Sequence, residues 1–243
     1  MIGNQFTEAV KRYSSINGGK FLLKAIFFDM DGVLFDSMPL HARSWIKTFK
    51  KYGIEIPEHE PYMNEGSTAY YTINKMFRKY QNRSVNSDLL EQIRMDKHQY
   101  MASLPPAGTV DSMPEFVNFV AENNIDCWVV TGSAQKNLID RLNMVYNGHF
   151  ERNKMVTAHD VKIGKPHPEP YLMALQKSGY HVGEVMVIEN APLGVESAKA
   201  AGLFTVAVNT GPINRQVLLD AGADVVFDEV KQLLDCRELI LKT

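Results

Sequence analysis

The chain has 243 residues and a formal net charge of −2, with 45% hydrophobic and 22% charged residues. This composition is typical of a soluble globular protein, and the length suits one large domain or a core domain with a smaller insert. The near-neutral charge gives no electrostatic reason to expect nucleic acid or an anionic membrane as a partner. An anionic substrate would therefore need a local basic site.

The first twenty residues contain no apolar core of the kind found in signal peptides, and no apolar run of the chain reaches the roughly 18 residues of a membrane span. They predict a short helix or a loose extension before the first strand. Cys127 and Cys236 are the only cysteines, and Cys127 lies in an apolar run, which favours a reduced thiol over a disulfide. A cytoplasmic protein is expected.

Short apolar runs then alternate with helical patterns. We expect strands at Lys24–Phe28, Ile125–Val130, Glu184–Ile188, Phe204–Val208 and Asp224–Phe227. Continuous runs of Val, Ile and Phe are typical of strands that are covered on both faces. We expect helices at Ser112–Asn123, Gln135–Tyr146, Pro168–Lys177, Leu193–Ala201 and Ile213–Leu219, the first with a capping box from Ser112 to Glu115. The alternation predicts an α/β fold with an open, mostly parallel sheet flanked by helices.

Residues 37–104 differ from the rest because they show no alternating strand pattern. Apolar residues recur at helical spacing in HARSWIKTFKKYG and in SDLLEQIRMDKHQYMASL. We therefore expect a small α-helical cap domain at 37–104, inserted into a core domain formed by residues 1–36 and 105–243. An insert directly after the first strand lies above the carboxyl ends of the strands, where open α/β sheets bind ligands, and could close as a lid.

The first expected strand ends in Asp29-Met30-Asp31-Gly32. The two carboxylates diverge if the backbone stays extended, and Gly32 permits a sharp turn directly afterwards. One carboxylate could attack phosphorus and form an aspartyl-phosphate. The other could protonate the leaving oxygen and then take a proton from water. The alternative interpretation is an Asp-Gly turn in which the acids only cap the backbone.

Two later loops carry candidates for binding an anion. Thr131, followed by Gly132 and Ser133, could hold a phosphate at the start of the next helix, or it could merely cap that helix. Lys165 lies in a stretch rich in Pro and Gly that would hold its ammonium group stiffly as a point charge for a phosphate. The alternative for Lys165 is a solvated loop lysine.

Glu189 and Asn190 follow the apolar run VMVI at the end of another expected strand. An acid and an amide oxygen near Asp29 could complete a site for a hard cation, and Mg²⁺ favours such oxygen ligands. A helix cap before Ala191 and Pro192 is the alternative for Asn190.

Together these stretches resemble the four motifs of the haloacid dehalogenase (HAD) superfamily. DMDGVLFDS is similar to the first motif, VVTGS to the second, KIGKPHPEPY to the third and VIENAPLGVESAKAAG to the fourth. The resemblance implies a Rossmann-like core with a cap domain, and Mg²⁺ as the cofactor. It also implies catalytic roles for Asp29, Asp31, Thr131 and Lys165, with metal ligands among Asp29, the Asp31 carbonyl, Glu189 and Asn190.

Two details of these motifs refine the expectation. Relatives that cleave carbon–halogen bonds lack an acid at the position of Asp31, because a halide needs no proton on leaving, so Asp31 favours phosphoryl transfer. Many relatives have Asp where this chain has Asn190, so the site loses one negative charge. Either Glu189 then carries more of the metal binding or Mg²⁺ binds more weakly.

The run from Asp29 to Trp45 resembles the β-phosphoglucomutase-like branch, which has a helical cap at this position. His41 falls where that branch carries a histidine associated with cap closure and acid/base alignment; a structural role is the alternative. Lys136 and Asn137 resemble residues of the mutase branch that help to bind a substrate phosphate or sugar, and solvated helix residues are the alternative.

A phosphohexomutase must also hold a second, distal phosphate, usually with cations from the cap. In β-phosphoglucomutases an arginine follows a Gly-x-Ser segment, and Ala69 takes its place here, after Gly66-Ser67-Thr68. Asp96 aligns near the other cap cation. The residues that could substitute are Lys75, Arg78 and Lys97.

We therefore predict a phosphatase that hydrolyses a small phosphorylated metabolite, with a sugar phosphate foremost. A β-phosphoglucomutase-like mutase is the first alternative, and a catalytically weak binding or regulatory protein is the second. A monomer or weak homodimer is expected, without nucleic acid or membrane as a partner.

Overall fold

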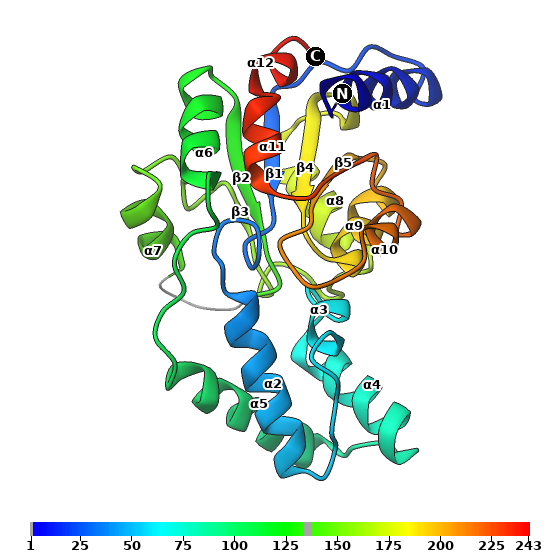
Figure 1. Ribbon diagram of the computed structural model, residues 1–243, viewed down its shortest axis with the longest axis vertical. Coiled ribbons are helices and arrows are strands. Elements are labelled where there is room, and N and C mark those ends of the chain that lie inside the picture. The colour runs from blue at the N-terminus through cyan, green and yellow to red at the C-terminus, as the bar shows by residue number, and fades with distance from the viewer. Residues whose placement is uncertain (1, 134–137) are drawn as a thin grey trace.

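The computed structural model describes residues 2–133 and 138–243, and its central layer is a six-stranded parallel sheet (Figure 1). The strands are β1 (Ala25–Phe28), β2 (Asp126–Val130), β3 (Met155–Val156), β4 (Val185–Glu189), β5 (Phe204–Val208) and β6 (Val225–Phe227). Their order across the sheet is β3-β2-β1-β4-β5-β6, so β1 lies in the interior between β2 and β4. The predicted fold class, a parallel sheet flanked by helices with a helical insert after the first strand, is confirmed.

All five predicted strands form, each within one residue of its expected bounds. Every residue of β1, β4, β5 and β6 is buried, as expected for strands with helices on both faces. The sequence did not reveal β3, because two residues are too short to give a readable apolar run.

Helices cover both faces of the sheet. On one face lie α1 (Ile2–Ile16), α6 (Met113–Glu122), α7 (Leu138–Val145), α11 (Val230–Asp235) and α12 (Arg237–Ile240). On the other lie α8 (Glu169–Ser178), α9 (Pro192–Ala200) and α10 (Arg215–Asp220), and a short 3₁₀ turn, η1 (Val182–Glu184), precedes β4. In the described part of the chain, no helix is both long and apolar enough to cross a lipid bilayer.

One predicted detail of these helices is wrong. Ser112 directly precedes α6, but its side chain makes no capping hydrogen bond. Its backbone is left-handed, with φ of 64°, whereas a capping residue normally has extended backbone angles that bring its oxygen to the first-turn N–H groups. Pro114 lies in the first turn of the helix, where its missing N–H group costs no hydrogen bond.

The N-terminal segment forms a helix, α1, rather than a loose extension. Its apolar face presents Phe6 and Tyr13 to Phe204 on β5, with ring centroids 5.8 and 5.4 Å from that of Phe204. The Tyr13 hydroxyl donates hydrogen bonds to the carbonyls of Gly202 at 2.7 Å and Val182 at 3.0 Å. The helix is therefore part of the core.

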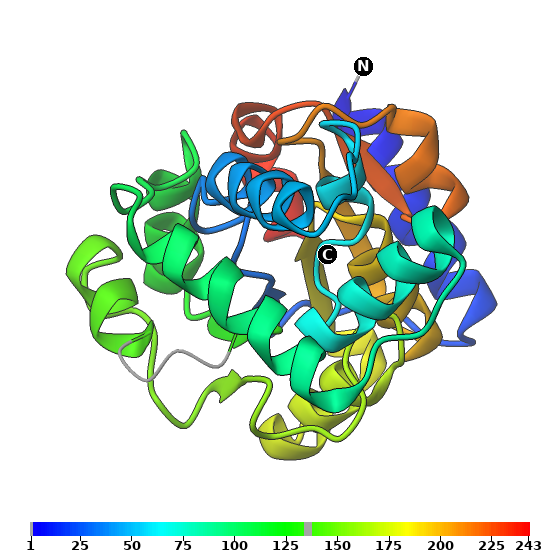
Figure 2. The same cartoon turned by 90° about the horizontal axis from the view of Figure 1, so that it is seen from below.

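The four helices of residues 37–104 are α2 (Met38–Lys51), α3 (Glu60–Met63), α4 (Ala69–Gln81) and α5 (Ser87–Ala102). They pack around an apolar cluster of their own that includes Trp45, Phe49, Ile73, Phe77 and Ile93. In Figure 2, seen from below, these helices lie in front of the sheet. We call residues 37–104 the cap; the exact division of the chain into two domains stays a prediction.

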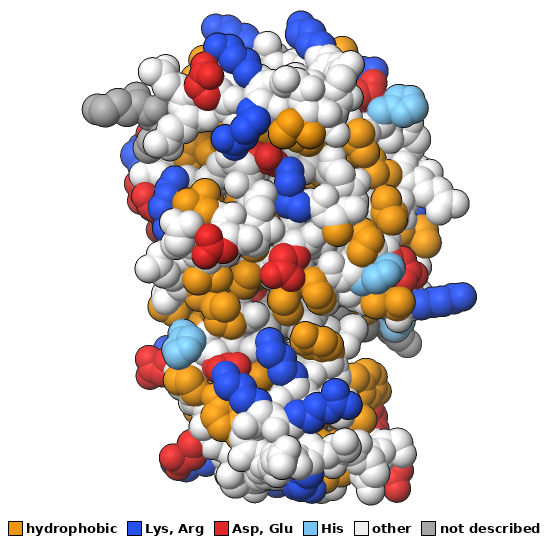
Figure 3. All heavy atoms as spheres, turned by 90° about the vertical axis from the view of Figure 1, so that its right-hand side faces the viewer, with side chains coloured by type: hydrophobic (Ala, Val, Ile, Leu, Met, Phe, Trp, Pro, Cys, Tyr) orange, Lys and Arg blue, Asp and Glu red, His pale blue; other side chains and the backbone are white. Residues whose placement is uncertain are grey.

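The cap lies against the core at several points. A Cβ atom at Gly132 would come within 3.1 Å of the Gly66 carbonyl oxygen, and one at Gly211 within 2.9 Å of the Tyr62 ring. Tyr62 and Met63 also pack against an apolar cluster of the core that includes Ile213. On the face drawn in Figure 3, hydrophobic side chains gather where the core meets the cap.

The packing of α1 can be tested with a pair of substitutions in this helix. Phe6 is fully buried, whereas Ile16 is 77% exposed. We expect Phe6→Ala to lower the free energy of unfolding by about 3 to 4 kcal/mol, because it leaves a cavity against β5. Ile16→Ala should change it by about 0.5 kcal/mol or less. Urea denaturation measures both, and equal effects of the two variants would contradict the packing described.

Candidate active site

The predicted site residues meet at the carboxyl edge of the sheet. Asp29 directly follows β1, Thr131 follows β2, and Asn190 follows β4, which ends at Glu189. Because β1 pairs with both β2 and β4 in parallel, the three loops that follow these strands are neighbours. The cap covers this edge, so the site lies at the junction between core and cap.

Lys165 is the centre of the group. Its ammonium nitrogen donates to Asp29 Oδ1 at 2.5 Å, to Glu189 Oε1 at 2.6 Å and to the carbonyl of Val130 at 3.0 Å. An ammonium group has three N–H donors, so these bonds use all of them. The side chain is only 1% exposed. The predicted site residue Lys165 thus contacts the predicted site residue Asp29 directly.

The charges of this group depend on one another. Burial raises the pKa of Asp29 to about 7, with Lys165 opposing the shift and Glu189 adding to it. Burial alone would lower the pKa of Lys165, but Asp29 and Glu189 outweigh it and raise the pKa above its ordinary value. Lys165 therefore stays cationic, and it supports the ionised form of Asp29 in a place where water does not.

Both carboxylate oxygens of Glu189 accept hydrogen bonds from the protein, one of them from Lys165. Besides Lys165, its Oε1 accepts from the Tyr171 hydroxyl at 2.8 Å, and its Oε2 accepts from the Asn190 N–H at 3.1 Å. A Cβ atom on Gly194, in the first turn of α9, would lie 2.0 Å from Oε1, so only glycine leaves room for the carboxylate there. Both oxygens of Glu189 already have partners.

Two other oxygens have no partner at all. Asp29 Oδ2 and Asn190 Oδ1 are buried and accept no hydrogen bond. Within the described ranges no three His, Cys, Asp or Glu side chains converge as a metal-binding group, so a metal here would need amide and backbone oxygens as well. A carboxylate oxygen and an amide oxygen suit Mg²⁺, so the residues fit the predicted ion. The fit favours Asn190 over Glu189 as the ligand from the fourth motif.

Asp31 is held by a different set of partners. Its Oδ1 accepts from the Ser37 hydroxyl at 2.5 Å and lies 3.5 Å from His41 Nε2 in the first turns of α2. Burial favours a higher pKa for Asp31, but His41, Ser37 and Lys97 outweigh it and lower the pKa to about 2. In this arrangement Asp31 is ionised and can accept a proton. The predicted site residue His41 is thus a neighbour of the acid.

Of the three cap residues that could replace the missing arginine, Lys97 lies at the site. Lys97 Nζ, on α5, lies 3.2 Å from His41 Nδ1 and close enough to Asp31 to lower its pKa. Asp96, which the sequence placed near the cap cation, instead accepts hydrogen bonds from Lys51 and Tyr52 within the cap. Lys97, the residue after Asp96, is therefore the one that lies at the site.

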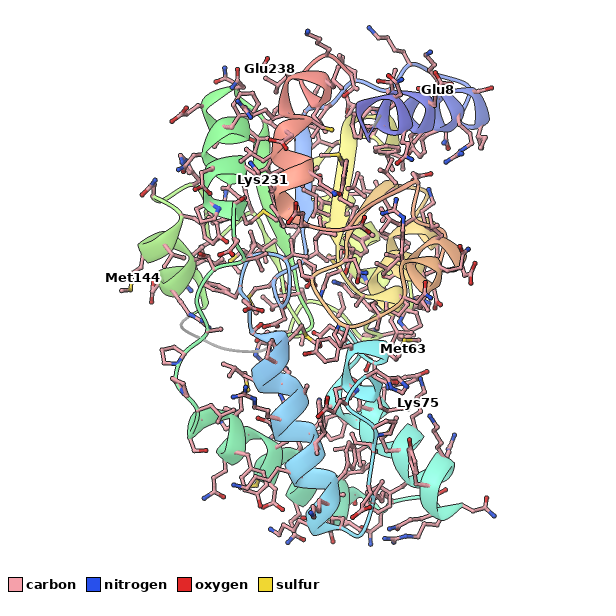
Figure 4. All side chains as sticks on the ribbon, viewed as in Figure 1. Glu8, Met63, Lys75, Met144, Lys231 and Glu238 are labelled. Atoms are coloured by element: carbon pink, nitrogen blue, oxygen red, sulfur yellow. The ribbon has the colours of Figure 1, made fainter. Side chains whose placement is uncertain are left out.

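The other two candidates lie elsewhere. Lys75 and Arg78 line a shallow groove on α4, together with Tyr70 and Tyr71. Lys75 lies beside α4 within the cap, whereas Met63 lies where the cap meets the core (Figure 4).

Sequence reasoning missed Glu65, which follows α3 in the cap. Burial raises its pKa well above the ordinary value, and the negative charges of Asp31 and Asp29 raise it further, while Lys97 lowers it. The cap therefore brings an acid as well as a cation to the site. Its one sequence signal was its place directly before the segment Gly66-Ser67-Thr68.

The second-motif loop is only partly described. Thr131 is buried, and its hydroxyl oxygen accepts from the Ser133 N–H at 3.0 Å, while Gly132 faces the cap loop at Gly66. The predicted substrate-binding residues Lys136 and Asn137 lie outside the described residues.

Known proteins resemble this chain over most of its length. Residues 26–208 match the family model of haloacid dehalogenase-like hydrolases. A structure from Bacteroides vulgatus, described as a candidate β-phosphoglucomutase, superimposes with a TM-score of 0.93 and 42% identity, covering 99% of this chain and 100% of that one.

Two relatives with named activities match by sequence. A phosphorylated carbohydrates phosphatase of Thermotoga maritima is 27% identical and covers 90% of this chain and 100% of its own. Hexitol phosphatase A of Escherichia coli is 29% identical over 76% of this chain and 83% of its own.

The assignment of ligands can be tested by metal binding alone. We expect Asn190→Asp to bind Mg²⁺ roughly tenfold more tightly than the wild type, because it adds a charge at a ligand position. Asn190→Ala should weaken binding. Isothermal titration calorimetry measures both.

Asn209→Asp is the matched control, because its amide oxygen is also buried without a partner, outside the predicted ligand set. An unchanged affinity in Asn190→Asp, or an equal gain in the control, would contradict a role for Asn190.

Proposed function

The chain belongs to the haloacid dehalogenase-like hydrolase family, and we propose that it is a Mg²⁺-dependent phosphatase acting on a small phosphorylated metabolite, with a sugar phosphate foremost. The observation that carries the proposal is the hydrogen-bonded group of Lys165, Asp29 and Glu189 beneath the cap. The resemblance inferred from the four sequence motifs is confirmed, and the chain is a phosphotransferase of this family.

In this proposal Asp29 is the nucleophile. Lys165 holds Oδ1 in place and balances its charge, so the carboxylate needs little reorganisation before it attacks phosphorus. The product of that step is an aspartyl-phosphate, formed as the bond from phosphorus to the leaving oxygen breaks. When bound to Asp29 and Asn190, Mg²⁺ would supply charge neutralisation at the transferred group.

Asp31 is the proposed acid and base. A pKa of about 2 in the present arrangement means that it is ionised, which suits the step in which it takes a proton from water. To act first as an acid it must hold a proton, and the loss of its contacts with His41 and Lys97 would raise its pKa. Since Lys97 comes from the cap, movement of the cap would change both contacts together.

Two observations favour hydrolysis over the mutase reaction. A mutase must hold a second phosphate near the cap, and the cap residue Glu65 brings a carboxyl group rather than a further cation close to Asp31. The cap cation Lys97 is already engaged with His41 and Asp31. The relatives named as phosphatases of phosphorylated carbohydrates and hexitols support the same choice.

The nucleophile can be tested directly. We expect wild-type protein with Mg²⁺ to release phosphate from a generic aryl phosphate, and Asp29→Asn to reduce release to background, because an amide does not form the acyl-phosphate. Circular dichroism should show that the variant keeps its fold. Beryllofluoride, which mimics a phosphoryl group on a carboxylate, should bind to the wild type only. A wild type without turnover or beryllofluoride binding would favour the weak binding or regulatory protein.

A second experiment separates the phosphatase from the mutase. The protein is incubated with β-glucose 1-phosphate, Mg²⁺ and a catalytic amount of the corresponding bisphosphate. We expect free phosphate to appear faster than glucose 6-phosphate, because Lys97 is already engaged with His41 and Asp31, and Glu65 offers a distal phosphate no positive charge. The reverse order of rates would reverse the assignment.

A further inference from the structure

Tyr171 is a buried polar group that the reaction described above leaves without a task. It lies on α8, six residues after Lys165, and its side chain is fully buried. Its hydroxyl donates to Glu189 Oε1 at 2.8 Å. Burial and the charges of Glu189 and Asp29 raise its pKa well above the ordinary value, so the hydroxyl keeps its proton and remains a donor.

The Tyr171 ring also contacts the other half of the ion pair. The Lys165 ammonium nitrogen lies 5.2 Å from the centroid of the Tyr171 ring, within the range of a cation–π interaction. One side chain thus touches the acceptor Glu189 with its hydroxyl and the cation Lys165 with its ring. Both contacts lie within the buried group formed by Lys165 and Glu189.

The hydrogen bonds around Glu189 show why this donor matters. Glu189 Oε1 accepts from both Lys165 and Tyr171, and Gly194 closes its other side so tightly that a Cβ atom would overlap it. Without the hydroxyl, Oε1 depends on Lys165 alone for a hydrogen bond. The carboxylate would then attract Lys165 more strongly and compete with Asp29 for the ammonium group.

We propose that Tyr171 is a positioning residue of the reaction. Its hydroxyl donates a hydrogen bond to Glu189, so that Lys165 keeps its hydrogen bonds to both Glu189 and the nucleophile Asp29. The inference rests on the proposed phosphatase function, because its main effect is on phosphoryl transfer. It assigns Tyr171 no contact with substrate.

The test begins with Tyr171→Phe, which removes only the hydroxyl. We expect kcat to fall about tenfold with KM changed less than twofold, because substrate binding does not involve Tyr171. Tyr146→Phe is the matched control: Tyr146 is also fully buried, but its hydroxyl donates to the Leu34 carbonyl away from the ion pair. Equal kcat values in wild type and Tyr171→Phe would overturn the proposal, as would an equal loss in the control.

A double-mutant cycle shows whether Tyr171 acts through Glu189. If it does, Tyr171→Phe should cause no further loss of kcat in a Glu189→Leu background, which has no acceptor for the hydroxyl, whereas Tyr146→Phe should have the same effect in both backgrounds. Independent losses for Tyr171 and Glu189 would overturn the proposal. The same cycle on unfolding free energy detects the hydrogen bond without any turnover, so an inactive wild type would reject the proposed function separately from this contact.

A second pair of variants covers the case in which Tyr171→Phe does not fold. Replacing Tyr171 with 4-aminophenylalanine keeps a donor on the ring, whereas 4-methylphenylalanine keeps the volume without a donor. We expect the amino variant to retain most of the wild-type kcat and the methyl variant to lose it. Equal activity in the two would overturn the proposal.

Discussion

The candidate site is organised around the buried ammonium group of Lys165. Lys165 lies between Asp29 and Glu189 with almost no exposure, and each carboxylate would be costly to bury alone. The ammonium group offsets one charge and is shared between two acceptors, so the group as a whole remains negative. Two oxygens near this group, Asp29 Oδ2 and Asn190 Oδ1, are left without donors. A divalent cation is the ligand that would complete the arrangement.

The sheet order makes this group possible. Asp29 and Glu189 come from neighbouring strands, and Lys165 reaches between them from the loop before α8. The strands could be predicted because each is a continuous apolar run, and the position of polar residues at strand ends follows from parallel pairing. The location of Asp29, Asp31, Lys165 and Asn190 near one another was therefore readable from the sequence together with its motifs.

The side chains that contact these residues could not be predicted from the sequence. Asp96 and Lys97 are adjacent on α5, and successive residues of a helix point about 100° apart, so a one-residue error in alignment exchanges a structural acid for a cation at the site. Glu65 and Tyr171 were missed for a related reason. Their roles come from contacts with side chains that are distant in sequence, and no local pattern marks such contacts.

The charges at the junction between cap and core explain why an amide, rather than a carboxylate, suits position 190. Four carboxyl groups gather at the junction, namely Asp29, Asp31, Glu65 and Glu189, with the lysines Lys97 and Lys165. Burial and their mutual repulsion already raise the pKa of Asp29 and of Glu65. A fifth carboxylate at position 190 would add repulsion toward a phosphate dianion, whereas an amide keeps an oxygen for a metal without that charge. Because Glu65 and Lys97 both come from the cap, the charge that a substrate meets depends on the position of the cap. In the proposed mechanism, binding of the metal, closure of the cap and protonation of Asp31 would therefore depend on one another electrostatically.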